Sequence, residues 1–356
     1  MSLDRAALLA WYRRERRDLP WRRTRDPYAI WLSETMLQQT RVETVIPYYQ
    51  RFLEHFPDVA ALASADLEEV YAHWAGLGYY SRARNLHAAA RRVVERFAGR
   101  LPHDAQELRS LPGVGRYTAG AVASIAFDRP EPVVDGNVER VLARALGIRE
   151  DVRRPDTTRR LWAEAAALAA GPAPGDLNQG LMELGATVCT PRAPRCEACP
   201  LARGCDARAA GDAETLPRKP RRAPPRAARA VAGLVLRRGR LLAVRRPPGG
   251  LLGGLWELPG GEPGRGEPLE RALARALREG VGLEVDDLEP AGALEHVFTH
   301  RRLRLHLYRC RSVRGRVRLD GFDRHRWVSP AEAPSVSQSA LMRRALSLAW
   351  PAGGRA

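Results

Sequence analysis

The sequence predicts a multidomain protein in which an all-α domain is followed by a smaller α+β domain. Up to about residue 187, apolar residues recur at helical spacing. Residues 207–229 are rich in Pro, Ala and Arg without a hydrophobic period, which is typical of a linker. After Val231 the apolar residues alternate, as they do in strands. A length of 356 residues suits two domains of this kind.

The charge of the chain favours a polyanionic partner. The formal net charge is +17 and the isoelectric point is near 10.7, although Lys219 is the single lysine. This excess of arginine suits the neutralisation of phosphates. The sequence has no apolar run of about 18 residues, so we expect no membrane span and a cytoplasmic, nucleoid-associated protein.

The first helices of the chain carry an acid on an apolar stripe. A helix over residues 3–17 is broken by Leu19–Arg22, and the next helix begins near Pro27. Ile30, Glu34 and Leu37 fall on one face of that second helix. If Glu34 is buried, desolvation raises its pKa and lets it donate a proton near neutral pH. The alternative is a glutamate at the edge of the stripe that reaches water.

Residues 111–140 predict a helix, a glycine turn and a helix, followed by an acidic residue that precedes a further helix. The turn over residues 112–115 can aim amide groups at a phosphate oxygen, or it can be an ordinary tight loop. Asp135 comes just before a helix over residues 138–146, where an N-cap is the commonest role of an aspartate.

Four of the five cysteines lie in one short loop. Cys189, Cys196, Cys199 and Cys205 are separated by six, two and five residues, which indicates a metal centre. The spacing alone leaves a zinc site and an iron–sulfur cluster open. Cys310 stands apart and is predicted to be a small buried hydrophobic residue.

Beyond Val231 the pattern predicts strands around two helices. A hairpin is expected over residues 231–246, and Leu303, Leu305 and Leu307 alternate with polar residues in a further strand. One helix carries Leu269, Leu273 and Leu277, and residues 337–349 suit a terminal helix.

The segments LPGVGRYTAG, VVDGNVERVLARAL and LSETMLQQT resemble the MutY family of the helix-hairpin-helix glycosylase superfamily. The resemblance implies an all-α helix-hairpin-helix glycosylase domain over residues 1–206, with the hairpin at about 105–125 and a 4Fe-4S cluster loop at 189–205. The linker at 207–229 then leads to residues 230–350, which resemble a Nudix domain that recognises 8-oxoguanine.

The same resemblance assigns roles to individual residues. Glu34 is the general acid, Asp135 is the catalytic carboxylate, and Tyr117 and Asn137 support them. The adenine pocket would contain Trp21, Arg22, Leu37 and Gln179. Contacts with DNA or 8-oxoguanine would come from Gln39, Tyr79, Gly113, Gly115, Phe298, Thr299 and His300. Cys189, Cys196, Cys199 and Cys205 would bind a 4Fe-4S cluster, and the hairpin could hold a monovalent cation.

Simpler interpretations remain open for several of these residues. Trp21 follows a proline and suits a core position as well as a pocket wall. Tyr79 could cap a helix junction instead of acting as a wedge in DNA. The family has Phe-Ser-His in its recognition turn, whereas this chain has Phe298, Thr299 and His300. Threonine keeps the hydroxyl group of serine.

The implied activity is a monofunctional adenine DNA glycosylase that acts as a monomer on double-stranded DNA with adenine opposite 8-oxoguanine or guanine. Enzymes that also cut the backbone need an amine nucleophile, and Tyr117 stands where the relatives with that activity have lysine. The one lysine, Lys219, lies in the expected linker.

Three rival functions follow from the same residues. A glycosylase for mismatched thymine would share the cysteine loop, and a catalytically silent DNA-binding protein would share the charge. A Nudix hydrolase would need acidic metal ligands. The Nudix motif aligns with Gly261, Glu267 and residues 275–283, where Ala276 and Gly280 replace two of its glutamates. We therefore expect recognition, and not hydrolysis, from this domain.

Overall fold

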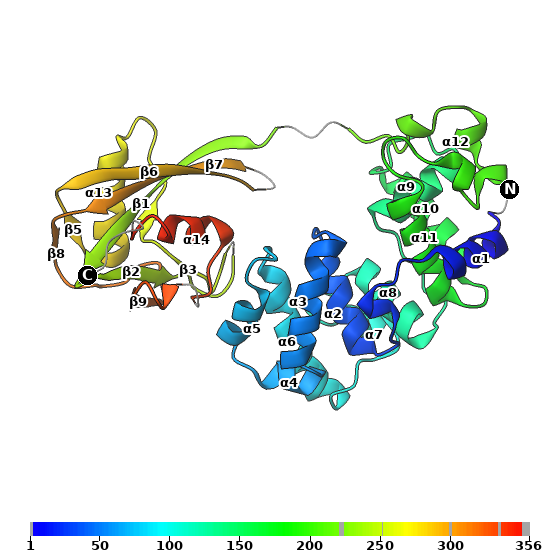
Figure 1. Cartoon of the computed structure of the whole chain (residues 1–356), viewed down its shortest axis with the longest axis horizontal. Helices are drawn as coiled ribbons and strands as arrows, with labels where there is room; N and C mark the ends of the chain where they lie inside the picture. The colour runs from blue at the N-terminus through cyan, green and yellow to red at the C-terminus, as the bar shows by residue number, and fades with distance from the viewer. Residues whose placement is uncertain (1–2, 221–223, 251, 299–300, 334–335, 351–356) are drawn as a thin grey trace. The chain divides into compact units, whose positions relative to one another are not determined.

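The computed structural model describes residues 3–220, 224–250, 252–298, 301–333 and 336–350, and it divides into two compact units (Figure 1). The first, which we call the helical unit, contains residues 1–65 and 85–221. The second, called here the mixed unit, contains residues 66–84 and 222–356. Within the described ranges, no helix is long and apolar enough to cross a membrane.

The helical unit is built from short α-helices joined by tight turns and 3-10 segments. The elements of this unit are α1 (Arg5–Glu15), η1 (Pro20–Arg22), α2 (Pro27–Leu37), α3 (Val42–His55), α4 (Val59–Ser64), α6 (Ser81–Phe97), α7 (Ala105–Arg109), α8 (Arg116–Phe127), α9 (Gly136–Ala145), α10 (Pro155–Ala169), α11 (Pro174–Thr187), η2 (Cys196–Ala198), η3 (Ala202–Gly204), α12 (Asp206–Ala209) and η4 (Ala213–Thr215). The first four residues of α6 belong to the mixed unit.

The central helix of this unit is α2. Asp26 caps its N-terminus by accepting a hydrogen bond from the Tyr28 amide, and Pro27 occupies the first helical position. Every residue from Tyr28 to Met36 is buried. A helix that is buried on all sides has no face for a glutamate to reach water, so the alternative interpretation, in which Glu34 lies at the edge of an apolar stripe and reaches water, is wrong.

The helix-hairpin-helix consists of α7, a glycine turn and α8. Asp104 caps α7, and the turn places Gly113 at a φ of +76°. A Cβ atom at Gly113 would lie 2.6 Å from the Cβ of Asn85, so a side chain there meets both backbone strain and a clash. The predicted hairpin at about residues 105–125 is present.

Helices α9 and α11 approach each other through a small residue. A Cβ atom on Gly185 of α11 would lie 2.6 Å from the Cβ of Asn137 in α9. This close approach brings the start of α9 beside the last turn of α11. The loop with four cysteines follows directly after α11.

The expected linker over residues 207–229 is shorter in the structure. Its first residues belong to α12 and η4, and its last residues, from Arg226 onward, already form a strand. Lys219 forms an ion pair with Glu139 of α9, within the helical unit. Because residues 207–229 have no hydrophobic period, the sequence did not indicate the helices at the start of this segment or the strand at its end.

The mixed unit has a seven-stranded sheet with the order β3-β2-β1-β7-β6, to which β4 and β9 add at β1 and β2. The strands are β1 (Arg226–Arg237), β2 (Arg240–Arg245), β3 (Trp256–Glu257), β4 (Gly260–Gly261), β6 (Leu288–Val297), β7 (Arg301–Cys310) and β9 (Arg324–Val328), and β5 (Glu284–Val285) pairs with β8 (Val313–Arg314) in a small second sheet. The central pair, β1 and β7, is parallel, whereas the other pairs are antiparallel.

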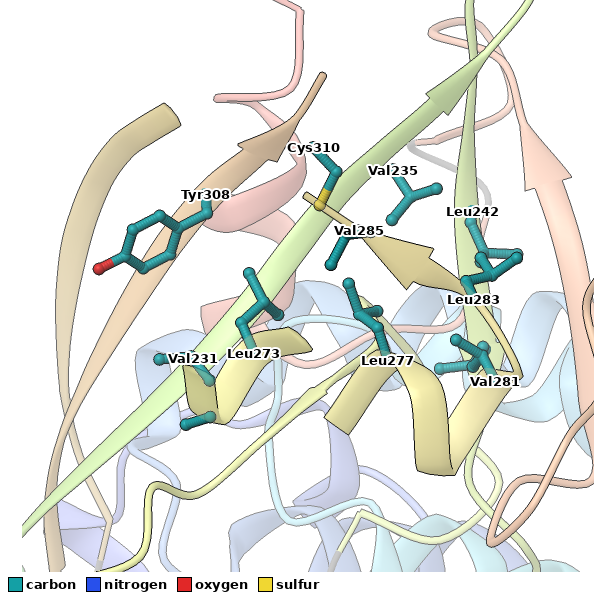
Figure 2. Close-up of a cluster of buried hydrophobic side chains, with 12 residues drawn as sticks. Val231, Val235, Leu242, Leu273, Leu277, Val281, Leu283, Val285, Tyr308 and Cys310 are labelled. Carbon is teal, nitrogen blue, oxygen red and sulfur yellow. The ribbon is translucent and has the colours of Figure 1, made fainter. Parts of the chain in front are cut away.

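A helix packs on each face of this sheet. Residues 231–235 of β1 are buried without interruption, as expected for a strand that is covered on both sides. On one face, α13 (Leu269–Val281) packs Leu273, Leu277 and Val281 against the strands, and Cys310 lies in the same apolar cluster (Figure 2). On the other face, α14 (Ala340–Leu346) packs Leu341 and Leu346 into a second cluster. The prediction of a small buried Cys310 is confirmed.

The mixed unit also includes the segment 66–84, whose helix α5 (Leu67–Trp74) precedes the glycine-rich stretch around Tyr79. The Tyr71 hydroxyl donates to the Gly253 carbonyl over 3.2 Å. The Tyr80 hydroxyl donates to the Gln338 carbonyl over 2.8 Å. Glu68 forms an ion pair with Arg245 at 2.6 Å. These contacts join the segment to the end of β2 and to two loops of the mixed unit.

Candidate active site

A cavity of about 740 Å³ lies in the helical unit where η1, α2, α8, α9 and α11 meet. Such a volume is in the range of small-molecule sites. Eleven of the residues predicted for the site line this one cavity, namely Trp21, Arg22, Glu34, Leu37, Gln39, Gly113, Gly115, Tyr117, Asp135, Asn137 and Gln179.

Glu34 is the acid at the centre of the cavity. Its side chain is 6% exposed, and its Oε2 accepts a hydrogen bond of 2.6 Å from the Tyr117 hydroxyl. Burial raises the pKa of Glu34 to about 7, and the charge of Asp135 adds to this, whereas the bond from Tyr117 and the charge of Arg22 lower it. Near neutral pH, a substantial fraction of Glu34 is therefore protonated.

Tyr117 stands on the first turn of α8, so the hairpin fixes its position. Its hydroxyl also lies 3.2 Å from the Met182 sulfur of α11. Burial, followed by the charges of Glu34 and Asp135, raises the pKa of Tyr117 well above its usual value. The phenol is thus a neutral donor to Glu34.

Asp135 is the N-cap of α9 and a wall of the cavity at the same time. Its Oδ1 accepts from the amides of Asn137 and Val138 at 2.9 and 2.7 Å, while its Oδ2 accepts from the Asn137 side chain at 3.2 Å. Burial raises the pKa of Asp135, and these three hydrogen bonds oppose part of that rise, so the pKa remains above its usual value. The two interpretations of Asp135 are compatible, because the cap holds a carboxylate at the cavity wall.

Glu183 of α11 is a cavity residue that the sequence pattern did not single out. It is 1% exposed and pairs with Arg17 at 2.8 Å and with Arg22 at 2.7 Å. Burial opposes ionisation, but the hydrogen bonds from both arginines bring the pKa of Glu183 down to about 2. It is therefore ionised at neutral pH. The sequence pattern could not single out Glu183, because its partners Arg17 and Arg22 lie more than 160 residues earlier in the chain.

The other predicted pocket residues surround these charges. Trp21 is 6% exposed and packs edge-on against Tyr49, with ring centroids 5.5 Å apart, so it is both a core residue and a cavity wall. Gln179 also donates weakly to the Gly175 carbonyl, at 3.4 Å. Gln39 follows α2 with a φ of +59°, a conformation that few non-glycine residues adopt.

The four cysteines Cys189, Cys196, Cys199 and Cys205 line a second cavity, beside α9 and the end of α11. Burial raises the pKa of Cys199, and the charges of Cys189, Cys205 and Cys196 add to this. Burial likewise raises the pKa of Cys205, with contributions from Cys189 and Cys196, which indicates that the four sulfurs are neighbours. Searched over the described residues alone, no group of three or more His, Cys, Asp or Glu is arranged to hold a single metal ion. The donor set itself, four thiols around one cavity, fits an iron–sulfur cluster.

Two arginines of α9 connect the cysteine loop to the first cavity. Arg140 donates to the Cys189 and Gly185 carbonyls, both at 2.7 Å, and to the Asn137 side chain at 2.9 Å. Arg144, which is 2% exposed, donates to the Thr190 carbonyl at 2.7 Å and lies 3.3 Å from the Cys189 sulfur. The same helix therefore carries Asp135 at its start and supports the cysteine loop further along.

The remaining predicted contacts belong to the mixed unit. Tyr79 is 47% exposed and has a φ of +49°, and the guanidinium of Arg82 lies 5.5 Å from its ring centroid. Phe298 is half-buried, with the His296 ring edge-on at 4.5 Å. Thr299 and His300 lie outside the described residues.

The segment aligned with the Nudix motif begins at β4 and runs through α13. Arg275 pairs with Glu267 at 2.9 Å and with Glu279 at 3.4 Å. Arg275 thus forms ion pairs with both of the carboxylates that remain from the motif, and the Ala276 side chain cannot bind a metal ion. This arrangement gives no acidic cluster for a metal ion.

The fold and these sites define a helix-hairpin-helix base excision DNA repair protein with a Nudix-like domain. The model of the HhH-GPD superfamily of base excision DNA repair proteins matches residues 32–166, and the NUDIX domain model matches residues 231–348. A solved thermostable thymine-DNA glycosylase is 31% identical, with a TM-score of 0.53, over 58% of this chain and 95% of that one. The predicted fold class is confirmed.

Within that class, the chain belongs to the adenine DNA glycosylase family. It is 42% identical over 360 residues to the human adenine DNA glycosylase, covering 85% of this chain and 66% of the human protein. It is 42% identical over 359 residues to the rat adenine DNA glycosylase, covering 85% of this chain and 69% of the rat protein. The chain thus spans about two thirds of the length of these mammalian relatives.

Proposed function

We propose that this protein is a monofunctional adenine DNA glycosylase that removes adenine opposite 8-oxoguanine, and opposite guanine, by extruding the base and hydrolysing its N-glycosidic bond. The observation that carries the proposal is the cavity in which Glu34, with its pKa near 7, lies with Tyr117, Asp135 and Asn137. Membership in the adenine DNA glycosylase family supports the choice of base.

Extrusion of the base precedes chemistry, because the glycosidic bond is inaccessible inside a duplex. Turning the nucleotide out of the stack costs a few kcal/mol. The cavity offers room for a base, and Gln39 at its wall is the side chain that would fill the vacated space. Gly113 and Gly115 of the hairpin line the same cavity, so backbone amides and a phosphate can meet beside it.

The departing adenine needs a proton, since its anion is a poor leaving group. Protonated Glu34 would supply that proton to a ring nitrogen while the glycosidic bond lengthens. Tyr117 keeps the Glu34 carboxyl oriented through its 2.6 Å bond. At pH 7 a group with a pKa near 7 is poised to give up its proton.

Positive charge then develops on the sugar, and a carboxylate beside it lowers the barrier. Asp135 would stabilise this oxocarbenium-like state, by its charge or by transient covalent capture. Its three hydrogen bonds from the start of α9 hold the carboxylate in place before the charge appears. Water completes the hydrolysis and leaves an abasic site.

Strand cleavage by a Schiff base is not part of the proposal. The position of the amine nucleophile is taken by Tyr117, whose hydroxyl is engaged with Glu34. Lys219, the single lysine of the chain, pairs with Glu139. Neither group supplies an amine to the cavity.

Recognition of 8-oxoguanine would come from the mixed unit. Exposed Tyr79 is the proposed wedge beside the damaged base, and the turn at Phe298, Thr299 and His300 would read it. The Nudix-like domain would serve recognition alone, because Arg275 neutralises the carboxylates left from the hydrolase motif.

The four cysteines would hold a 4Fe-4S cluster, which fixes the shape of the loop after α11. Arg192, Arg195 and Arg203 are exposed in or near this loop and suit DNA phosphates. A monovalent cation at the hairpin, a monomeric state and a location at the nucleoid complete the proposal. A brown protein with absorption from thiolate to iron would support the cluster, whereas a colourless protein with stoichiometric zinc would contradict it.

The deciding experiment is single-turnover incubation with duplexes that carry A opposite 8-oxoguanine, A opposite C, or T opposite G. Breaks at the adenine of the first duplex that appear only after alkali would establish the proposed activity. Breaks without alkali, or trapping by borohydride, would overturn the monofunctional part. Preference for the third duplex would favour a thymine glycosylase, and tight binding without base release would favour a silent binding protein.

A further inference from the structure

One buried carboxylate and two arginines form a charged cluster at the edge of the first cavity. Glu183 Oε1 accepts from the Arg17 amide at 3.0 Å and from Arg17 Nε at 2.8 Å. Glu183 Oε2 accepts from Arg17 Nη2 at 2.8 Å and from Arg22 Nη2 at 2.7 Å. Both oxygens are thus fully engaged, and the carboxylate joins α11 to the chain corner that follows α1.

Arg22 is the member of this cluster that faces the pocket. Its side chain is 9% exposed, its Nη1 donates to the Arg17 carbonyl at 3.1 Å, and its guanidinium lies 5.6 Å from the Tyr12 ring centroid. These contacts use two of the five N–H donors of a guanidinium. Because Arg22 also lines the cavity, donors remain for an acceptor atom of a base within it.

Charge within the cluster is unbalanced, with two cations around one anion. Arg22 is one of the groups whose charge acts on Glu34, where it favours the ionised form. The other groups that face Glu34 are Tyr117 from α8 and Asp135 at the start of α9. Glu183 offsets part of the positive charge of Arg22, and Arg17 pairs with the same carboxylate and so weakens this offset.

We propose that Glu183 is a positioning residue of the base pocket, which holds the Arg22 guanidinium against the cavity and balances its charge so that protonated Glu34 stays available. The proposal rests on the proposed adenine excision. It differs from a purely structural role, because a buried ion pair that only supports the fold would leave the proton affinity of Glu34 unchanged.

Two substitutions in the cluster should act in opposite directions. Glu183→Gln removes the anion, so more positive charge faces Glu34. This charge stabilises the ionised form of Glu34 and lowers its pKa. The pH above which excision falls should move down by about half a unit. Arg17→Gln removes a cation and leaves Glu183 less neutralised, so the same midpoint should move up by about half a unit.

The experiment measures single-turnover adenine excision between about pH 5.5 and 9, where the Glu34 group titrates. Asp176→Asn is the matched control, since it also removes a carboxylate of α11 that pairs with an arginine, Arg13 at 3.3 Å, without touching Arg22. The pH midpoint of Asp176→Asn should stay at the value of the unmutated protein. Glu183→Asp keeps the negative charge, so its midpoint should move less than that of Glu183→Gln.

Midpoints that move in the same direction, or that stay in place for both variants, would overturn the proposal. Should Glu183→Gln fail to fold, Arg17→Gln still decides, because the Arg17 side chain is 37% exposed and its loss leaves Glu183 paired with Arg22. Carbon NMR titration of the Glu34 carboxyl, assigned with Glu34→Gln, gives the same two shifts without turnover. If the Glu34 titration shifts with the expected signs in a protein that removes no adenine, the proposed function would be wrong, whereas the positioning role of Glu183 would stand.

Discussion

The Tyr117 hydroxyl donates a 2.6 Å hydrogen bond to Glu34 Oε2, and this bond joins the hairpin to the acid. Tyr117 is on the first turn of α8, whereas Glu34 is on the central helix α2. A donor stabilises the ionised carboxylate, so Tyr117 works against the burial that raises the pKa of Glu34. Helix α8 of the hairpin thereby influences the protonation of Glu34.

Tyr117→Phe should move the pH dependence of excision upward. Removal of the phenol takes away the hydrogen bond that lowers the pKa of Glu34, so burial acts with less opposition. The pH at which excision is half-maximal should rise by about one unit, which single-turnover rates across pH would measure. Tyr28→Phe is the control, because it removes a buried hydroxyl of α2, the helix that carries Glu34, which donates to the Phe56 carbonyl and not to Glu34. A midpoint that falls, or one that moves equally in both variants, would contradict this prediction.

Glu34→Gln should stabilise the protein at alkaline pH while it abolishes excision. Burial raises the pKa of Glu34 from 4.5 to about 7, so the folded protein holds this proton more tightly than the unfolded chain. The resulting stability is fully present below pH 4.5 and is lost as the pH rises through 7, by about 3 kcal/mol in total. Glutamine cannot ionise, so it avoids that loss.

Thermal unfolding of the unmutated protein and Glu34→Gln at pH 5 and pH 8 measures this effect. The variant should gain in melting temperature relative to the unmutated protein on going from pH 5 to pH 8. Asp135, whose pKa is also raised, is common to both proteins and cancels in the comparison. A difference that does not change with pH would show that Glu34 is not buried in its neutral form.

Local sequence patterns predicted the elements that carry Glu34 and Asp135. Asp26 caps α2 and Asp135 caps α9, because each aspartate accepts hydrogen bonds from amides of its own helix terminus, and Pro27 suits the first position of α2 because it has no N–H to satisfy. The burial of Glu34 was beyond such patterns, since periodicity places an acid on a face of a helix without telling what surrounds that helix. Only the packing of neighbours around all of α2 determines it.

Long-range partners explain what the sequence could not reveal. Glu183 meets Arg17 and Arg22 across separations of 166 and 161 residues, and no local spacing encodes such a meeting. The parallel pairing of β1 with β7 likewise joins Arg226 to Arg301. The helical pattern of residues 66–84 suggested part of the first domain, whereas in the structure this segment belongs to the same compact unit as the sheet.

Arg140→Gln should destabilise the protein and slow excision together. Arg140 is 9% exposed, and its loss leaves the buried Cys189 and Gly185 carbonyls without their donor, at a cost of about 2 to 4 kcal/mol. Asn137 also loses a partner, and its amide holds Asp135. Denaturant unfolding and single-turnover rates should both change, whereas Arg160→Gln, an exposed residue of α10, should change neither. Normal excision in a destabilised Arg140 variant would show that the contacts of Arg140 with the cysteine loop do not affect the function proposed for Asp135.

Tyr80→Phe should weaken the preference for adenine opposite 8-oxoguanine. Its hydroxyl donates to the Gln338 carbonyl over 2.8 Å, and the adjacent Tyr79 is the proposed wedge. Loss of a buried hydrogen bond costs about 1 kcal/mol, so the ratio of excision rates on A:8-oxoguanine and A:G should fall several-fold.

The matched control for this prediction is Tyr308→Phe, which removes a hydroxyl bonded to Glu270 at 3.0 Å elsewhere in the mixed unit. Its rate ratio should equal that of the unmutated protein, because Glu270 belongs to α13 and not to the segment with Tyr79. Rates on A:G should stay nearly constant in Tyr80→Phe, since Glu34 and Asp135 are unaltered. If both rates fell equally, the hydrogen bond to Gln338 would support the fold of the mixed unit and not the reading of the damaged base.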